Sequence, residues 1–229
     1  MNPAARTRIK ICGLTREQDV GCAVAAGADA VGFVQYPPSP RFVDASRTAE
    51  LARLLPPFVT PVLLFVNASA TDIAAACAAI PGAMLQFHGD ETPNFCSEVA
   101  RRLGRPFLRA ARIPVDGSGG FNLLEFASRY THAQALLLDA HVDGYGGGGK
   151  TFNWSLLPPS VDAHLVLSGG LNTANVIDGI TQLRPRCKSL AVDVSSGVER
   201  SKGIKDPEKI HQFVAAVRAA DEQFRISRT

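Results

Sequence analysis

Residues 62–66 read Val-Leu-Leu-Phe-Val and residues 135–138 read Ala-Leu-Leu-Leu, so both runs are almost entirely apolar. Strands covered on both faces have this composition, and such strands are typical of parallel sheets. The run at 62–66 is followed by an alanine-rich stretch, 71–79, whose composition predicts a helix. A strand followed by a helix predicts an α/β fold built on a parallel sheet.

Working outward from these runs, the same pattern gives eight predicted strands. They are Arg8–Cys12, Ala30–Val34, Val62–Val66, Ala83–Phe87, Pro106–Ala110, Gln134–Leu138, His164–Leu167 and Leu190–Val194. Helices are predicted between them, the first capped by Thr15, and a last helix is expected from Pro207 to Ala220. Eight such units in 229 residues favour a single (β/α)8 TIM barrel spanning 1–229 over an open doubly wound sheet.

The composition excludes several classes of protein. Hydrophobic residues make up 46% and charged residues 20%, which is enough apolar material for a large core. The net charge of +3 is scattered along the chain, which argues against nucleic-acid binding. There is no apolar run long enough for a membrane span and no leader-like start. Five cysteines without a CxxC pair predict neither disulfides nor a zinc site, and favour the cytoplasm.

Polar residues and glycines recur at the carboxyl ends of the predicted strands or just after them. They are Cys12, Gln86, His88, Asp139, Ser168, Gly169, Gly170, Asp193, Ser195, Ser196 and Gly197. Because the active sites of parallel barrels lie at the carboxyl ends of the strands, these side chains are expected to share one face.

The last two strands are each followed by a candidate phosphate-binding loop. Gly169-Gly170 and Ser195-Ser196-Gly197 would expose backbone N–H groups close to helix starts, an arrangement that favours anions. The alternative is that they are only tight turns and caps.

Cys12 and Asp139 are the candidates for proton transfer. A thiolate can act as a base if its pKa falls from about 8.5, and a carboxylic acid can donate a proton if part of it stays neutral. The competing interpretation of Cys12 is a small buried strand residue, and that of Asp139 is a loop or capping residue. Arg41, in Ser39-Pro40-Arg41, is either a fork for a substrate carboxylate or a solvated surface cation.

Residues 144–151, Gly-Tyr-Gly-Gly-Gly-Gly-Lys-Thr, match the P-loop pattern GxxxxGK[ST]. A P-loop follows directly on a strand and opens a long helix. Five residues separate this segment from Leu138, and the stretch after it ends at Pro158-Pro159. The context therefore argues against nucleotide binding and favours a glycine-rich loop that closes over a barrel mouth.

Taken together, these segments resemble the phosphoribosylanthranilate isomerase family from about Arg8 to Ala219. The matching pieces are 9–15 (IKICGLT), 39–41 (SPR), 85–89 (LQFHG), 137–139 (LLD), 150–154 (KTFNW), 167–171 (LSGGL), 193–199 (DVSSGVE) and 203–206. Gly148 replaces a hydroxyl residue common in the family, and Asn153 stands where aspartate is common.

The resemblance implies a TIM barrel that converts N-(5-phosphoribosyl)anthranilate to 1-(2-carboxyphenylamino)-1-deoxyribulose 5-phosphate by an Amadori rearrangement, in tryptophan biosynthesis. It implies that Cys12 is the general base, Asp139 the general acid and Arg41 the ligand of the anthranilate carboxylate. It also places Asp193 at the substrate and the two loops on its phosphate. No metal or cofactor is implied, and the chain is expected to be a monomer or a homodimer.

Two other functions compete with this prediction. Indole-glycerol-phosphate synthase chemistry uses a lysine and a glutamate, and no suitable lysine follows the predicted strands. A non-catalytic barrel that senses a phosphorylated ligand would need neither Cys12 nor Asp139.

Overall fold

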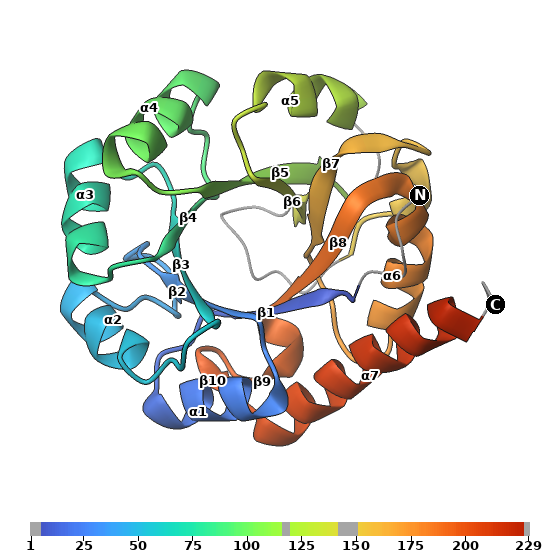
Figure 1. Ribbon diagram of the computed structural model, residues 1–229, viewed down its shortest axis with the longest axis horizontal. Helices are drawn as coiled ribbons and strands as arrows, with labels where there is room; N and C mark the ends of the chain where they lie inside the picture. Colours follow the sequence, from blue (N-terminus) through green and yellow to red (C-terminus); the bar gives the residue numbers. More distant parts are fainter. Residues whose placement is uncertain (1–5, 116–119, 142–150, 227–229) are drawn as a thin grey trace.

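The computed structural model describes residues 6–115, 120–141 and 151–226. Eight parallel strands form a closed barrel in chain order, with helices around it (Figure 1). The strands are β1 (Arg8–Cys12), β2 (Ala30–Val34), β3 (Thr60–Phe65), β4 (Met84–Phe87), β5 (Phe107–Pro114), β6 (Ala135–His141), β7 (Val161–Leu167) and β8 (Cys187–Val194). The prediction of a (β/α)8 barrel is confirmed.

Seven α-helices cover the barrel in the described part of the chain. They are α1 (Glu17–Ala26), α2 (Ala45–Ala52), α3 (Ala70–Ala79), α4 (Pro93–Leu103), α5 (Leu123–Arg129), α6 (Val176–Leu183) and α7 (Pro207–Ile226). A short 3-10 turn, Trp154–Leu156, precedes β7. A two-stranded hairpin, β9 (Glu199–Ser201) and β10 (Ile204–Lys205), lies between β8 and α7.

Local sequence signals explain where the helices begin. The side chains of Asp44, Ser69, Thr92 and Asn122 each accept a hydrogen bond from a backbone N–H in the first turn of α2, α3, α4 and α5. The prediction that Thr15 caps the first helix is wrong. The hydroxyl of Thr15 instead donates to the carbonyl of Gly203, 2.7 Å away, and α1 begins at Glu17.

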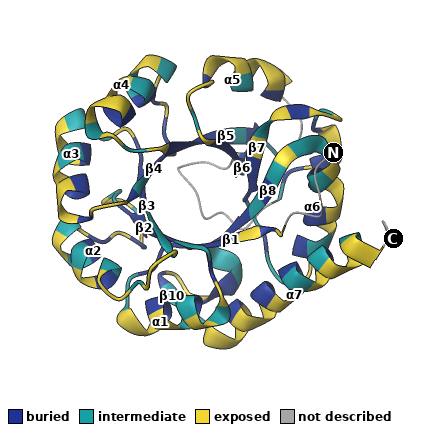
Figure 2. Cartoon of the chain, viewed as in Figure 1, coloured by how far each residue is buried: buried dark blue, intermediate teal, exposed yellow. Residues whose placement is uncertain are grey.

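The strands alternate between two cores. Side chains that point outward, such as Ile9, Leu85 and Leu136, pack beneath the helices in the main core. Side chains that point inward fill the barrel with Val62, Leu108, Ala110, Ala135, Leu137 and Val166. Most residues of the barrel strands are buried, and the outer faces of the helices are exposed (Figure 2). A few strand residues near the amino ends, such as Arg8, Asp162 and Lys188, are exposed as well.

Candidate active site

The inward-facing residues change from apolar to polar toward the carboxyl ends of the strands. In β6, Asp139 follows Leu137 on the inner face. The register pairs Leu138 with Leu167 and Leu167 with Val192, and its continuation by one residue places Asp139 beside Ser168, just after β7, and Ser168 beside Asp193. Asp193 is itself paired with Lys10. One row across four adjacent strands therefore carries four polar side chains. All four are buried, so this end of the barrel interior is a polar site enclosed by protein.

Asp139 lies within β6, whereas the sequence suggested that it follows the strand. The strand continues to His141 because β5 runs to Pro114 and pairs with it over this length. The inward orientation expected for Asp139 is unaffected, since it depends only on alternation along the strand.

Cys12 is the last residue of β1 and is buried above this row. Its thiol interacts with the ammonium of Lys10, whose Nζ lies 2.8 Å from Oδ1 of Asp193. Gly32 on the paired strand β2 provides the space, because a Cβ there would lie 2.6 Å from the sulfur of Cys12 and 3.0 Å from Nζ of Lys10. Cys12, Lys10 and Asp193 thus form one compact cluster.

The cluster affects the protonation of Cys12 in opposite directions. Burial raises the pKa of the thiol above its ordinary value, and the positive charge of Lys10 lowers it again in part. The net direction is upward, so the lowered pKa that would favour a thiolate is not present in the protein alone. A base at this position would depend on the Lys10 cation.

Asp139 is held by a second polar chain from β4. Its Oδ2 lies 2.8 Å from Nε2 of His88, and Nδ1 of His88 lies 3.0 Å from the amide nitrogen of Gln86. All three side chains are buried. The other oxygen of Asp139, Oδ1, faces Gly169, because a Cβ on that glycine would lie 3.0 Å from it. Asp139 therefore connects the polar interior to the loop after β7.

The two predicted phosphate loops are in contact. A Cβ on Gly197 would overlap the carbonyl oxygen of Leu171, so the loop after β8 packs directly on the loop after β7. Gly169 and Gly170 have φ angles of 75° and 64°, which residues other than glycine rarely adopt. The loop that contains Gly169 and Gly170 and the loop that contains Ser195, Ser196 and Gly197 therefore lie against each other.

The expected helix starts are not at these loops. Ser196–Val198 is a three-residue 3-10 turn, and α6 begins at Val176, several residues beyond Gly170. The intervening segment is occupied by turns in which Asn172 and Asn175 bond to neighbouring backbone. An anion in this region would therefore be bound by glycine backbone N–H groups rather than by a helix dipole.

Arg41 is buried and forms a bidentate ion pair with Glu199 of β9. Nε and Nη2 of the guanidinium lie 2.8 and 2.7 Å from the two carboxylate oxygens. Lys205 of β10 contacts the same carboxylate at 2.8 Å and the backbone oxygen of Ser195 at 3.1 Å. The interpretation of Arg41 as a solvated surface cation is therefore wrong, because one edge of its fork is bound inside the protein.

This network links Arg41 to the phosphate loops through Glu199 and Lys205. Sequence reasoning assigned no role to Lys10, Gly32, Glu199 or Lys205. Lys10 could have been noticed, since a lysine in the middle of a buried strand is rare without a partner. Glu199 could not, because it lies 158 residues from Arg41 along the chain.

Three further predictions concern the glycine-rich segment, metal binding and membrane spans. Residues 144–150 of the P-loop-like segment are outside them, so its geometry is not described. Within the described ranges, no group of three or more His, Cys, Asp and Glu side chains is placed to bind a metal ion. No helix in those ranges combines the length and apolarity needed to cross a bilayer.

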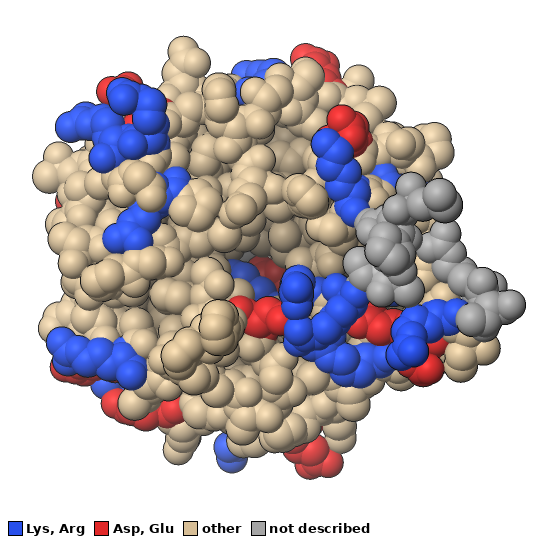
Figure 3. Space-filling model, viewed as in Figure 1, with Lys and Arg blue, Asp and Glu red and all other residues tan. Residues whose placement is uncertain are grey.

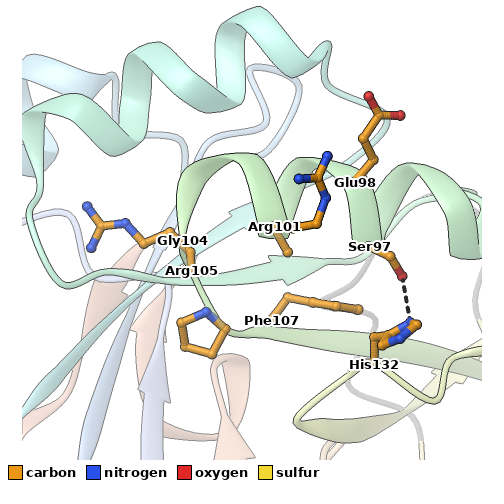
Figure 4. Close-up of a pocket in the computed structure, with 9 residues that line it drawn as sticks. Ser97, Glu98, Arg101, Gly104, Arg105, Phe107 and His132 are labelled. Atoms are coloured by element: carbon orange, nitrogen blue, oxygen red, sulfur yellow. Dashed lines mark hydrogen bonds between the residues drawn. The ribbon is translucent and has the colours of Figure 1, made fainter.

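Two other cavities lie toward the amino ends of the strands. One of about 620 Å³ is bordered by Arg6, Arg8, Asp29 and Lys10, and charges of both signs gather beside a central hollow in the space-filling view (Figure 3). The other, of about 460 Å³, lies along α4 and the start of β5, where Ser97 bonds to His132 at 3.3 Å (Figure 4). Neither contains Cys12 or Asp139.

Comparisons with known proteins identify the family of this chain. The family model described as N-(5'phosphoribosyl)anthranilate (PRA) isomerase matches residues 9–216. An N-(5'-phosphoribosyl)anthranilate isomerase of Methylibium petroleiphilum is 62% identical over 97% of this chain and 99% of its own length. One from Leptothrix cholodnii is also 62% identical, over 95% and 93%.

Solved structures give the same result. The phosphoribosyl anthranilate isomerase of Thermotoga maritima is 37% identical with a TM-score of 0.77, covering 93% of this chain and 99% of that one. A second structure, of the enzyme in complex with reduced 1-(o-carboxyphenylamino)-1-deoxyribulose 5-phosphate, is 35% identical with a TM-score of 0.75 over the same shares. The chain belongs to the N-(5'-phosphoribosyl)anthranilate isomerase family.

Proposed function

We propose that this protein converts N-(5-phosphoribosyl)anthranilate to 1-(2-carboxyphenylamino)-1-deoxyribulose 5-phosphate, an aldose–ketose isomerisation in tryptophan biosynthesis. The observation that carries the proposal is the pair of buried, inward-facing groups Cys12 and Asp139 at the carboxyl end of one barrel, in a chain of this family. Asp139 lies beside the glycine loop proposed for phosphate, and Cys12 lies beside the ion pair of Lys10 with Asp193.

The first step is ring opening, with Asp139 as the general acid. The proton on Oδ1 of Asp139 passes to the ribose ring oxygen, the bond from that oxygen to C1′ breaks, and the nitrogen lone pair forms a C1′=N⁺ double bond. In the substrate, the ring oxygen is separated from the phosphate ester by only two carbon atoms. A phosphate bound at Gly169-Gly170 would therefore bring the ring oxygen close to Oδ1, which faces Gly169.

The second step is proton abstraction, with Cys12 as the general base. The thiolate takes the proton from C2′, and the electrons of that C–H bond form a C1′=C2′ double bond while the nitrogen becomes neutral. The resulting enolamine then loses its C2′ hydroxyl proton and gains a proton at C1′, which gives the ketone. The oxidation at C2′ is balanced by the reduction at C1′, so the chemistry requires no redox cofactor.

The substrate's two anionic ends have different ligands in this proposal. Backbone N–H groups of Gly169, Gly170 and the loop Ser195–Gly197 bind the phosphate. Arg41 binds the anthranilate carboxylate with donors on its Nη1 edge, because Glu199 occupies the Nε–Nη2 edge. Asp193 lines the site indirectly, since it fixes Lys10 beside Cys12.

Three further expectations concern the location, the assembly and the partners of the enzyme. We expect the protein to work in the cytoplasm as a monomer or a homodimer, with no nucleic acid as partner. One related structure is described as coming from a dimeric isomerase of Thermotoga maritima. Sedimentation analysis at several concentrations would decide between the two states for this chain.

The test is a turnover assay that follows the loss of anthranilate-derivative fluorescence. Cys12→Ser and Asp139→Asn are each expected to lower kcat by roughly 10²- to 10⁴-fold, the usual contribution of a general acid or base, while a reduced product analogue still binds. Near wild-type turnover of either variant would remove that residue from its role.

The same two substitutions at positions outside the site serve as controls. Cys22→Ser on α1 and Asp162→Asn in β7, whose side chain is 90% exposed, should leave kcat unchanged. A protein that binds the analogue without any turnover would instead be a sensor. Rescue of a tryptophan auxotroph that lacks this step, with the two site variants as controls, tests the same proposal in the cell.

A further inference from the structure

Gln86 is a buried polar residue that the proposed chemistry does not use. Its side chain points into the barrel from β4, between Leu64 on β3 and Leu108 on β5 in the register. It is fully buried, and its Oε1 has no hydrogen-bond partner among the described protein groups. A buried amide with an unpaired oxygen destabilises a fold at a position where a leucine would pack. The presence of glutamine here therefore needs an explanation.

The amide nitrogen of Gln86 decides the state of His88. It lies 3.0 Å from Nδ1 of His88, so it donates a hydrogen bond to that nitrogen. An Nδ1 that accepts cannot carry a proton, and the proton of the neutral ring must then be on Nε2. The state of one ring nitrogen is thus fixed by the bond that the other makes.

His88 in turn decides where Asp139 can carry its proton. Nε2–H of His88 donates to Oδ2 of Asp139 across 2.8 Å. A protonated carboxyl oxygen accepts hydrogen bonds much more weakly than an unprotonated one, so this bond to Oδ2 favours a neutral Asp139 with its proton on Oδ1. That is the oxygen that faces Gly169 and the loop proposed for phosphate.

We infer that Gln86 is a positioning residue that acts through His88 to keep the acidic proton of Asp139 on the oxygen facing the substrate. This inference rests on the proposed function of Asp139. Without Gln86, the proton of the neutral His88 ring could lie on Nδ1 instead. Nε2 would then accept a hydrogen bond from a protonated Oδ2 of Asp139. In that arrangement the acidic proton points away from the ring oxygen, so molecules in this state do not open the ring, and the average rate of ring opening falls.

The first test observes the ring directly and does not depend on turnover. The chain contains five histidines, so ¹⁵N-labelled histidine gives a small set of side-chain signals, and His88→Asn identifies the one from His88. The wild-type protein is expected to show His88 protonated on Nε2 alone. In Gln86→Glu the carboxylate accepts a hydrogen bond, so Nδ1 is expected to gain a proton. A wild-type His88 protonated on Nδ1 alone would overturn the inference.

The second test measures catalysis in Gln86→Leu and Gln86→Glu. We expect kcat to fall by roughly 10-fold and 100-fold, part of the effect of losing a general acid, with KM changed by no more than about 2-fold. With substrate deuterated at C2′, the isotope effect on kcat should become smaller, because ring opening is slowed and proton abstraction is not. If the substitution only reduced the fraction of folded protein, the apparent kcat would fall but the isotope effect would stay unchanged.

Gln35→Leu is the matched control. Gln35 donates to the carbonyl of Val43 and the hydroxyl of Thr48, so it fastens α2 to the barrel. Its loss should lower stability and leave both kcat and the isotope effect unchanged. If Gln86→Leu behaves like this control, the inference is wrong. If the wild type itself does not turn over the substrate, the proposed function fails, and the His88 signals still report whether Gln86 selects the tautomer.

Discussion

Gly32 and Cys12 are paired across β2 and β1, and the absence of a side chain on Gly32 leaves the space that the Cys12 sulfur and the Lys10 ammonium occupy. A Cβ at this position would lie 2.6 Å from Sγ. The orientation of the proposed base is therefore set by a residue with no chemistry of its own.

Gly32→Ala should displace the thiol and lower kcat by roughly 100-fold, because misplacement by about 1 Å has that effect on a reacting group. The measurement is steady-state turnover together with the unfolding midpoint. Gly21→Ala is the control, since a Cβ at Gly21 in α1 meets nothing within 4 Å and alanine favours helices. Equal kcat for the two variants would show that Gly32 does not position Cys12.

The pH dependence of kcat/KM should reflect the raised pKa of Cys12. A base must be deprotonated, so activity is expected to increase with pH, and the increase should continue above the ordinary thiol range because burial raises this pKa. Lys10→Met removes a charge that lowers the pKa, and the increase should move to still higher pH. At neutral pH, a thiol whose pKa is higher by about 1 has about 10-fold less thiolate, and activity should fall in proportion.

Lys10→Arg retains the positive charge and should change the profile less than Lys10→Met does. Lys188→Met is a surface control, since Lys188 is half-exposed and pairs with exposed Asp162. A profile that moves to lower pH in Lys10→Met would contradict the assignment of Cys12 as the base.

Glu199→Gln should destabilise the fold by about 3–5 kcal/mol, because Arg41 and Lys205 would be left as buried charges without their partner. Burial alone would raise the pKa of Glu199, but the two cations lower it overall. A carboxylate with a lowered pKa stabilises the fold above its unfolded pKa and loses this effect as pH falls.

Urea denaturation at neutral and acidic pH checks this prediction. The difference between wild type and Glu199→Gln should be large at pH 7 and shrink as the pH falls below the ordinary range for glutamate. Glu98→Gln should change stability by less than about 1 kcal/mol, since Glu98 and its partner Arg102 are exposed. A constant difference at all pH values would mean that the ion pairs do not stabilise the fold.

Gly169→Ala should impair both phosphate binding and catalysis. A Cβ at Gly169 would crowd the backbone of Ala140 and lie 3.0 Å from Oδ1 of Asp139. We expect weaker binding of inorganic phosphate by calorimetry and a lower kcat. Gly82 also has a positive φ, but a Cβ there would meet nothing within 4 Å. Gly82→Ala therefore shows the effect of backbone strain without crowding. Phosphate affinity that falls equally in both variants would exclude Gly169 from the phosphate site.

The strand pattern allowed the barrel to be predicted because buried parallel strands are almost uniformly apolar. β1 and β2 have the predicted bounds, and the inward positions of Cys12, Asp139 and Asp193 follow from alternation. β5 and β6 extend further than predicted, because pairing with a neighbouring strand lengthens both, and a local pattern does not contain that pairing.

The partners of the site residues could not be predicted, since each joins distant parts of the chain. Asp193 pairs with Lys10 across 183 residues, and Asp139 with His88 across 51. The sequence marked Gln86 and His88 as polar residues near the end of a strand, but only the structure shows that they form a chain leading to Asp139.

The ion pair between Lys10 and Asp193 joins the first strand of the barrel to the last. Because the two residues are 183 positions apart, the lysine beside Cys12 has no carboxylate partner until Asp193 has been synthesised. A break near the middle of the chain would put the proposed base Cys12 and His88 in one fragment, and the proposed acid Asp139 and Asp193 in the other. If Cys12 and Asp139 have the proposed roles, neither fragment alone is expected to be an active enzyme.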